Sequence, residues 1–146
     1  MPVHPNLVFI DTNVWFSAFY GSQNAEKLLK AHVGGEIKAV ISQKVLTELI
    51  TNVRNKIPEV YKPLEKFLRS SPPTILSDSR KISKDVSKSV DINDQIIFQT
   101  AVDSKISIFI TGNLKHFRRD SLEKSFPVKI FTPSEAIQYL SSHHIL

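Results

Sequence analysis

Short apolar runs alternate along the chain with longer segments in which apolar residues recur every three or four positions. The short runs are typical of strands buried on both faces, as in a parallel sheet. The recurring pattern is typical of amphipathic helices with one buried face. The five predicted strands comprise residues 8–10, 37–41, 74–76, 106–110 and 128–131.

The segments between these strands contain helix boundary signals. A helix with its apolar stripe on residues 25–32 ends at Gly34. His32 belongs to that stripe, so we expect it to pack rather than to bind a ligand. Ser42 is the expected N-cap of the next helix, and Thr132 is the expected N-cap of the last one.

Strands that alternate with helices predict an α/β protein. We expect a three-layer fold, with a five-stranded, mainly parallel sheet flanked by helices. The 146 residues suit a single domain, 1–146, with a substantial core. Apolar runs stay well short of the roughly 18 residues of a membrane span, so no membrane partner is expected.

Composition narrows the class of protein further. The chain contains no cysteine, which excludes a disulfide framework and a thiolate metal site. The start of the chain has no charged segment followed by an apolar one, so we expect no secretory signal and a cytoplasmic protein. The net charge of +5 suits a polyanionic partner such as nucleic acid, although a basic surface in contact with solvent alone explains it equally well.

Polar side chains follow two of the predicted strands where each ends. Asp11 follows the first strand, and Asn113 closely follows the fourth. Asp94 stands at the head of the apolar stripe of a helix, and Glu48 lies at the margin of another stripe. Since ligands of open α/β sheets bind at the carboxyl edge of the strands, we expect these four side chains to converge there.

Each acid also has a purely structural interpretation. Asp11 and Asp91 are suited to cap helices, and we expect capping to be the main role of Asp91. Glu48 could form a surface ion pair with Lys44, four residues earlier. Asp94 differs, because it points along the face that docks on the sheet, where an ordinary surface acid is not expected.

Three carboxylates that share a site repel one another, and a divalent cation relieves that repulsion. Oxygen ligands without cysteine or paired histidine suit Mg²⁺ or Mn²⁺ rather than zinc. Such a cation among basic residues is suited to phosphoryl transfer, with water as the nucleophile. The basic residues that follow the fourth strand are Lys115, Arg118 and Arg119. The histidine between them, His116, is expected at the surface.

Four segments together resemble the motifs of PIN-domain ribonucleases, in the same order and at similar spacing. The first runs from Val8 to Val14, with Ser17 beyond it, and the second runs from Ile41 to Leu49. The third comprises Asp94 and Ala101, and the fourth comprises residues 109–113 with His116 and Phe117. VapC-like toxins and related single-domain PIN toxins are the most similar branch.

This resemblance implies a five-stranded parallel sheet and Mg²⁺- or Mn²⁺-dependent endonucleolytic cleavage of single-stranded RNA. By analogy, Asp11, Glu48 and Asp94 are metal ligands, and they form the catalytic set with Asn113. Many family members have aspartate where this chain has Asn113, which leaves open whether a second ion binds.

The resemblance extends to the surroundings of this catalytic set. Asp91 is a further candidate ligand that could supply the charge that Asn113 lacks. Thr12, Asn13 and Thr111 are expected to orient carboxylates or water. Lys115, Arg118 and Arg119 are candidate RNA contacts. By analogy with VapC-like toxins, a small antitoxin protein and a homodimer are also expected.

Two other functions fit part of the pattern. Phosphatases of the haloacid dehalogenase type also begin with a strand and an aspartate, but their motif requires a second aspartate where this chain has Asn13. A PIN-like module that only binds RNA or protein is the other alternative. The three acids Asp11, Glu48 and Asp94 argue against it, because a binding module has no need for buried carboxylates.

Overall fold

The computed structural model describes residues 5–146, so residues 1–4 of the predicted domain lie outside the described part. Five strands form one sheet in the order β3-β2-β1-β4-β5. All four pairs of neighbouring strands are parallel, as expected. The strands are β1 (Leu7–Ile10), β2 (Lys38–Ser42), β3 (Thr74–Leu76), β4 (Ile108–Ile110) and β5 (Lys129–Phe131).

Within residues 5–146, eight α-helices and three short 3₁₀ helices connect and follow the strands. The helices before β3 are α1 (Thr12–Tyr20), α2 (Gln23–Val33), α3 (Gln43–Lys56), η1 (Pro58–Val60) and α4 (Tyr61–Ser70). Those after β3 are α5 (Lys84–Ser89), η2 (Ile92–Asp94), α6 (Gln95–Asp103), η3 (Leu114–His116), α7 (Arg119–Ser125) and α8 (Pro133–Ser142). Of these described helices, none is long and apolar enough to cross a membrane.

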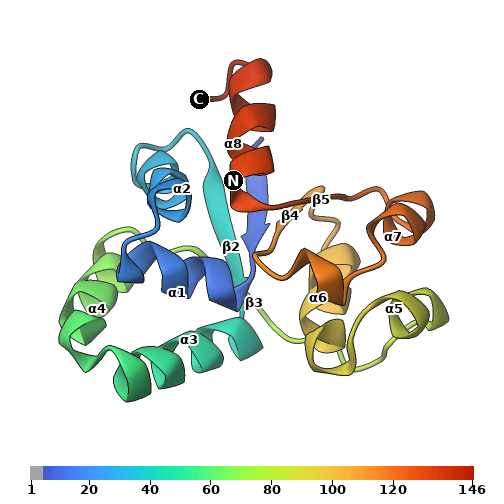
Figure 1. Ribbon diagram of the computed structural model, residues 1–146, viewed down its shortest axis with the longest axis horizontal. Coiled ribbons are helices and arrows are strands. Elements are labelled where there is room, and N and C mark those ends of the chain that lie inside the picture. Colours follow the sequence, from blue (N-terminus) through green and yellow to red (C-terminus); the bar gives the residue numbers. More distant parts are fainter. Residues whose placement is uncertain (1–4) are drawn as a thin grey trace.

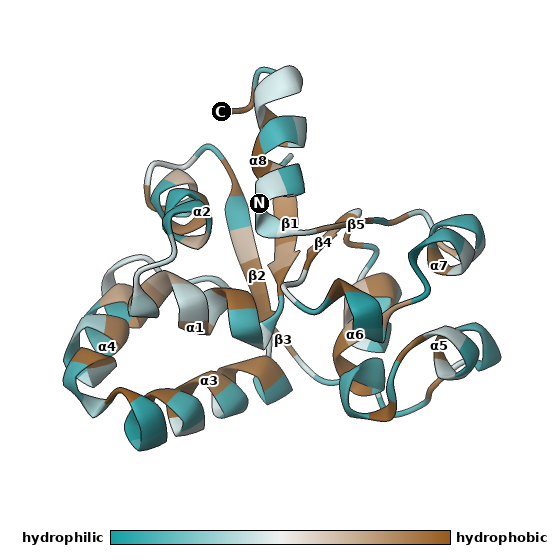
Figure 2. Ribbon diagram, viewed as in Figure 1, coloured by the Kyte–Doolittle hydropathy of each residue, from teal (hydrophilic) through white to brown (hydrophobic). Residues whose placement is uncertain are grey.

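The helices form layers on the two faces of the sheet. Figure 1 shows α1 to α4 on one side of the strands and α5 to α7 on the other, with α8 packed beside α2. Figure 2 shows that β1 is hydrophobic along its length, whereas α5 at the periphery is mostly hydrophilic. The predicted three-layer α/β architecture is therefore confirmed.

The core is densest around β1 and β4. Val8, Phe9 and Ile10 of β1 are fully buried. The rings of Phe9 and Phe109 stack across these two neighbouring strands with centroids 5.3 Å apart. Phe98 of α6 then packs edge-on against Phe109, at 5.0 Å. This aromatic contact anchors α6, the helix that follows Asp94, to the centre of the sheet.

Three predicted strands begin one or two residues too early. Ile37, Ile106 and Val128 are buried as expected, but they precede the paired strands. The amide of Ile106 instead donates to Ala101 O at the end of α6, and the amide of Val128 donates to Phe126 O. Buried residues therefore continue beyond the ends of the paired strands. An apolar pattern in the sequence reports burial and does not show which buried residues are paired in the sheet.

The outer edge of β5 is closed by two side chains of α7. The Ile130 amide donates to Glu123 Oε2 at 2.8 Å, and Arg119 Nη1 donates to Ile130 O at 3.3 Å. Arg119 also forms an ion pair with Glu135 of α8, at 2.8 Å. Glu135 in turn completes the capping box with Thr132 that was expected at the start of this helix. The backbone groups of Ile130 are thus already hydrogen-bonded.

The direction of strand order reverses at β1. This strand pairs with β2 on one side and with β4 on the other, and the chain reaches β4 only after it has formed β3. In open parallel sheets, ligands bind in the crevice at the carboxyl ends of such strands. Asp11 follows β1, and Thr111 follows β4, so both lie at this crevice.

Candidate functional site

Asp11 is a buried carboxylate at the carboxyl end of β1, with 2% of its surface exposed. Its Oδ1 accepts a hydrogen bond from the Thr12 amide at 2.8 Å, which makes Asp11 the N-cap of α1. Its Oδ2 accepts a hydrogen bond from Thr111 Oγ1 at 2.9 Å. Asp11 thus caps α1 as its structural interpretation expected, and the two hydrogen bonds together fix the orientation of the carboxylate.

Glu48 approaches Asp11 from α3. The hydroxyl of Thr12 donates to Glu48 Oε1 at 2.8 Å, which ties the beginning of α1 to the second turn of α3. The structure thus gives Glu48 this partner on α1, where a surface pair with Lys44 was the structural alternative. Thr12 holds two of the predicted acids, because its amide binds Asp11 while its hydroxyl binds Glu48.

Asn13 connects α1 to the loop after β4. The Gly112 amide donates to Asn13 Oδ1 at 2.7 Å. Residue 112 must be glycine for this contact, because a Cβ atom there would lie 2.8 Å from the same oxygen. The loop leads to Asn113, whose amide donates to Thr111 Oγ1 at 3.1 Å. Asn13 and Thr111 therefore set the position of Asn113.

We expect Gly112→Ala to lower the free energy of unfolding by about 1–2 kcal/mol, because the methyl group displaces Asn13 and breaks this hydrogen bond. Urea denaturation measures the loss. In an Asn13→Ala background, Gly112→Ala should lower the free energy of unfolding much less, because the side chain that the methyl group displaces is absent. Equal losses in the two backgrounds would show that the contact does not hold the loop.

Asp94 is the N-terminal neighbour of α6, and 17% of its side chain is exposed. Its Oδ2 lies 3.0 Å from His116 Nδ1. The Nε2 atom of the same ring lies 3.8 Å from Asp91 Oδ2. The side chain of His116 is 32% exposed, so it lies near the surface as expected, but it is not isolated, since the imidazole bridges two acids.

A short antiparallel pairing brings His116 to these acids. Val90 and Phe117 form an isolated β-bridge, in which the Asp91 amide donates to His116 O and the Arg118 amide donates to Ser89 O. Asp91 precedes η2 as expected, but its side chain makes no capping hydrogen bond, so the expected capping role of that side chain is wrong. Its carboxylate is directed to the histidine instead.

One pocket collects the predicted side chains. It has a volume of about 250 Å³, and its walls include all four residues of the predicted catalytic set, Asp11, Glu48, Asp94 and Asn113. Thr12 and Asn13 line it as well, together with three residues that the sequence analysis did not select. These three are Phe16, Asn52 and Lys56.

Burial and mutual repulsion act on the acids in this pocket. Burial raises the pKa of Asp11 to about 6, against the opposing effect of its hydrogen bonds from Thr111 and Thr12. The charges of Asp94 and Glu48 raise the pKa of Asp11 further. Burial also raises the pKa of Asp94, partly opposed by His116. The negative charges of Asp94 and Glu48 therefore act directly on the buried carboxylate of Asp11.

The donor set fits a hard divalent cation. Buried carboxylate oxygens with raised pKa values gain most from a positive charge between them. The candidate ligand atoms of Asp91, Asp94 and His116 also lie within 4.8 Å of one another. Asp94 therefore belongs to a compact group of possible ligands with Asp91 and His116, and it also shares the pocket with Asp11 and Glu48.

The predicted basic residues divide into two groups. Lys115 and Arg118 are exposed and line a small pocket of about 200 Å³ next to His116 and Asp91. Arg119 is instead bound to Glu135 and to Ile130 O. Arg119 therefore stabilises the junction of α7, β5 and α8, whereas Lys115 and Arg118 remain near the acids.

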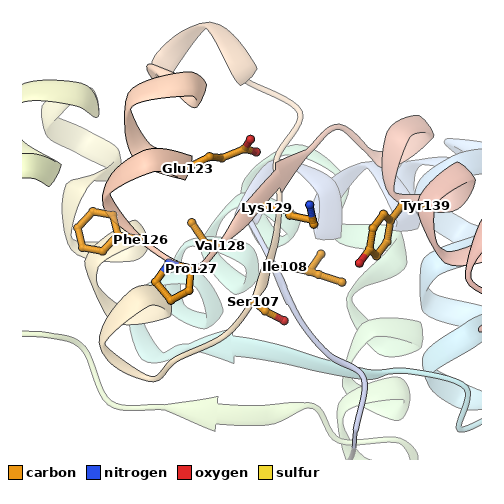
Figure 3. A pocket seen from close by; sticks show the side chains of 8 residues that line it. All are labelled: Ser107, Ile108, Glu123, Phe126, Pro127, Val128, Lys129 and Tyr139. Atoms are coloured by element: carbon orange, nitrogen blue, oxygen red, sulfur yellow. The ribbon is translucent and has the colours of Figure 1, made fainter.

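A larger cavity, of about 350 Å³, lies away from this chemistry (Figure 3). Its walls include Ile108 and Lys129, the first residues of β4 and β5, so it lies at the amino ends of these strands. The carboxylates are at the carboxyl ends. Size alone therefore does not identify the functional site of this molecule.

A family model described as PIN domain matches residues 7–115, which include the four residues of the pocket that were predicted to be catalytic. The chain belongs to the PIN domain family. This membership argues against the phosphatase alternative, and so does the structure around Asn13, whose amide oxygen is occupied by Gly112. Membership in this family supports a nuclease activity.

Solved structures similar to this PIN domain confirm the fold. A toxin–antitoxin complex from Klebsiella pneumoniae contains a chain with 21% identity and a TM-score of 0.54, and the match covers 76% of this chain and 90% of that one. VapBC2 from Rickettsia felis, bound to a DNA fragment from its promoter, has 19% identity and a TM-score of 0.57. That match covers 86% of this chain and 98% of the other. No curated protein matches the sequence.

Proposed function

We propose that this PIN domain is a Mg²⁺- or Mn²⁺-dependent endoribonuclease that cleaves single-stranded RNA. The observation that carries the proposal is the convergence of Asp11, Glu48, Asp94 and Asn113 on one pocket at the point where strand order reverses. These residues come from four separate segments of the chain. A module that only binds RNA has no use for acids whose burial opposes their ionisation.

In this proposal Asp11, Glu48 and Asp94 hold the cation, and Asp91 is a further candidate ligand. The ion supplies positive charge that favours ionisation of an attacking water and stabilises the phosphate oxygens as negative charge develops on them. Thr12 and Thr111 fix both oxygens of Asp11, which keeps this carboxylate in one orientation. Thr12 occupies Oε1 of Glu48, so Oε2 is the atom proposed to face the ligand.

Asn113 contributes an amide where many members of the family have a carboxylate. An amide can donate to a phosphate oxygen or accept from water, but it adds no negative charge. Its position depends on the contacts of Thr111 and Asn13 with the loop. We therefore assign Asn113 to the orientation of substrate or water rather than to the neutralisation of a second ion.

The toxin component of a toxin–antitoxin system is the proposed biological role. The Klebsiella pneumoniae structure is described as a toxin–antitoxin complex and the Rickettsia felis structure as VapBC2, and both folds match most of this chain. A small antitoxin protein is accordingly the proposed partner. The homodimer expected from the resemblance stays a prediction.

The deciding experiment compares three activities of the purified protein. Labelled single-stranded RNA is incubated with Mg²⁺ or Mn²⁺, with and without EDTA, beside p-nitrophenyl phosphate as a phosphatase substrate. Cleavage of the RNA that EDTA abolishes and excess Mn²⁺ restores supports the nuclease. Hydrolysis of p-nitrophenyl phosphate alone, or RNA binding without cleavage, contradicts it.

His116 is expected to act on the metal through Asp94. A side chain that orients a ligand typically accounts for about 10–100-fold in metal affinity. We expect His116→Ala to weaken Mn²⁺ binding by about that factor, as measured by isothermal titration calorimetry. His143→Ala is the matched control, because His143 is an exposed histidine that directly follows the last residue of α8 and does not line the acidic pocket. Equal affinity in the wild type and His116→Ala would remove His116 from the site.

Arg118 is expected to contact the RNA backbone. Each phosphate contact with a single strand contributes about 0.7 to the slope of log affinity against log salt concentration. Arg118→Ala should therefore reduce that slope by about 0.7 and weaken binding, as measured by fluorescence anisotropy. Arg69→Ala, on α4 across the sheet, should leave the slope unchanged. The same slope in Arg118→Ala and wild type would exclude this contact.

A further inference from the structure

Two rows of side chains lead away from the acidic pocket. On α1, residues 12, 16 and 20 are spaced by four and share one face of the helix. On α3, residues 48, 52 and 56 have the same spacing. The two helices are in contact and lie side by side in Figure 1. Each row begins at the acids, with Thr12 bound to Glu48.

The two rows meet again about one turn further along α1 and two turns further along α3. Lys56 Nζ lies 5.7 Å from the centroid of the Phe16 ring. The rings of Phe16 and Tyr20 are nearly parallel, at 18°, with centroids 5.9 Å apart. Phe16, Asn52 and Lys56 form part of the wall of the acidic pocket. An aromatic pair and an ammonium group thus continue directly from the proposed metal ligands.

The two rings of this pair differ in burial, because Phe16 is partly buried against the core while Tyr20 extends into solvent. Helix α1 buries Val14, Trp15 and Ala18 on its other face. The last side chain of the row, Tyr20, is 71% exposed. Gly21 ends the helix immediately afterwards with a φ of 115°. A large ring is therefore held at the surface, at the open end of a pocket wall.

We infer that Phe16 and Tyr20 form a stacking platform for a base of single-stranded RNA, with Lys56 placed to contact the adjoining phosphate. This inference rests on the nuclease proposed above. Aromatic rings bind single strands by stacking on bases, and a neighbouring cation binds the backbone. A chain with a net charge of +5 favours such a polyanionic ligand.

The platform binds a nucleotide beside the cleaved bond rather than at it. A helix rises 1.5 Å per residue, so Tyr20 lies about 12 Å along α1 from Thr12. Since every base has a π-face, the platform holds the substrate with little preference for base identity. It also favours single strands, because a base paired inside a duplex cannot lie on the rings.

The test measures binding separately from cleavage. In an Asp11→Asn background, which prevents turnover, we expect Tyr20→Ala to weaken binding of a short oligouridine by about tenfold, as measured by fluorescence anisotropy. Tyr20→Phe retains the ring and should bind within about twofold of the parent. Val33→Ala removes another exposed apolar side chain, on α2, and should bind like the parent.

An oligonucleotide that lacks one base identifies stacking itself. In the parent protein, removal of the base at one position of the oligonucleotide should weaken binding. In Tyr20→Ala, removal of the same base should cause no further loss of affinity. Equal affinity of Tyr20→Ala and the parent for the intact oligonucleotide overturns the platform, even if wild-type protein cleaves RNA. Failure of the wild type to cleave or bind RNA would overturn both the platform and the nuclease.

Discussion

Asp11→Asn is expected to reduce the rate of RNA cleavage by about a thousandfold or more, because it removes a charge that holds the catalytic cation. The same change should stabilise the metal-free protein. Asparagine retains the shape of the side chain and can still accept from the Thr12 amide, but it carries no buried charge. Initial rates with labelled RNA and urea denaturation in EDTA, both at pH 7.5, measure the two effects.

A loss of activity together with a gain of stability in Asp11→Asn distinguishes a functional carboxylate from a structural one. If Asp11 served only as a helix cap, the substitution would change neither the stability of α1 nor the specific activity appreciably, because asparagine caps helices about as well as aspartate. Asp94→Asn is the companion variant, with the same expected loss of activity. An Asp94→Asn protein that unfolds, and whose folded fraction cleaves RNA normally, would show that Asp94 is not a metal ligand.

The stability of the metal-free protein is expected to fall as pH rises from about 4 to about 6. Burial raises the pKa of Asp11 to about 6 in the folded state, while the unfolded chain ionises near pH 3.9. Between these values the folded state binds more protons, so the free energy of unfolding decreases with rising pH. Two pKa units correspond to about 3 kcal/mol at neutral pH.

Urea denaturation of the wild type and Asp11→Asn across this pH range isolates the contribution of Asp11, because the other titrating groups are common to both proteins. The difference in unfolding free energy between the two should change by about 3 kcal/mol and level off above pH 6. Saturating Mn²⁺ should remove the loss of stability that ionised Asp11 causes, and it should do so in the wild type alone. A difference that does not vary with pH would contradict the raised pKa of Asp11.

The architecture was predictable because the signals that determine it are local. Each of the five strands is a short apolar run, and the N-caps Ser42 and Thr132 mark helix starts by side-chain chemistry. Asp11 could be selected for the same reason, since it directly follows a buried strand. The limits of the strands were less certain, because Ile106 and Val128 are buried without pairing in the sheet.

The residues that sequence analysis missed depend on contacts between distant segments. His116 reaches Asp94 because Val90 pairs with Phe117, and no local sequence pattern predicts that pairing. Phe16 was indistinguishable from a core aromatic until α1 and α3 were placed together. The spacing of residues 12, 16 and 20 was visible in the sequence, but only the structure shows that it faces a matching row on α3.

Closure of the outer edge of β5 limits how the protein can associate. An open strand edge recruits other strands and promotes fibrillar assembly, and charged side chains are one way to prevent it. Glu123 and Arg119 already occupy the amide and carbonyl of Ile130, so an incoming strand would have to displace an ion-paired arginine. Disruption of these contacts, for example by Glu123→Ala, would therefore leave the Ile130 amide free to pair with a strand of another molecule.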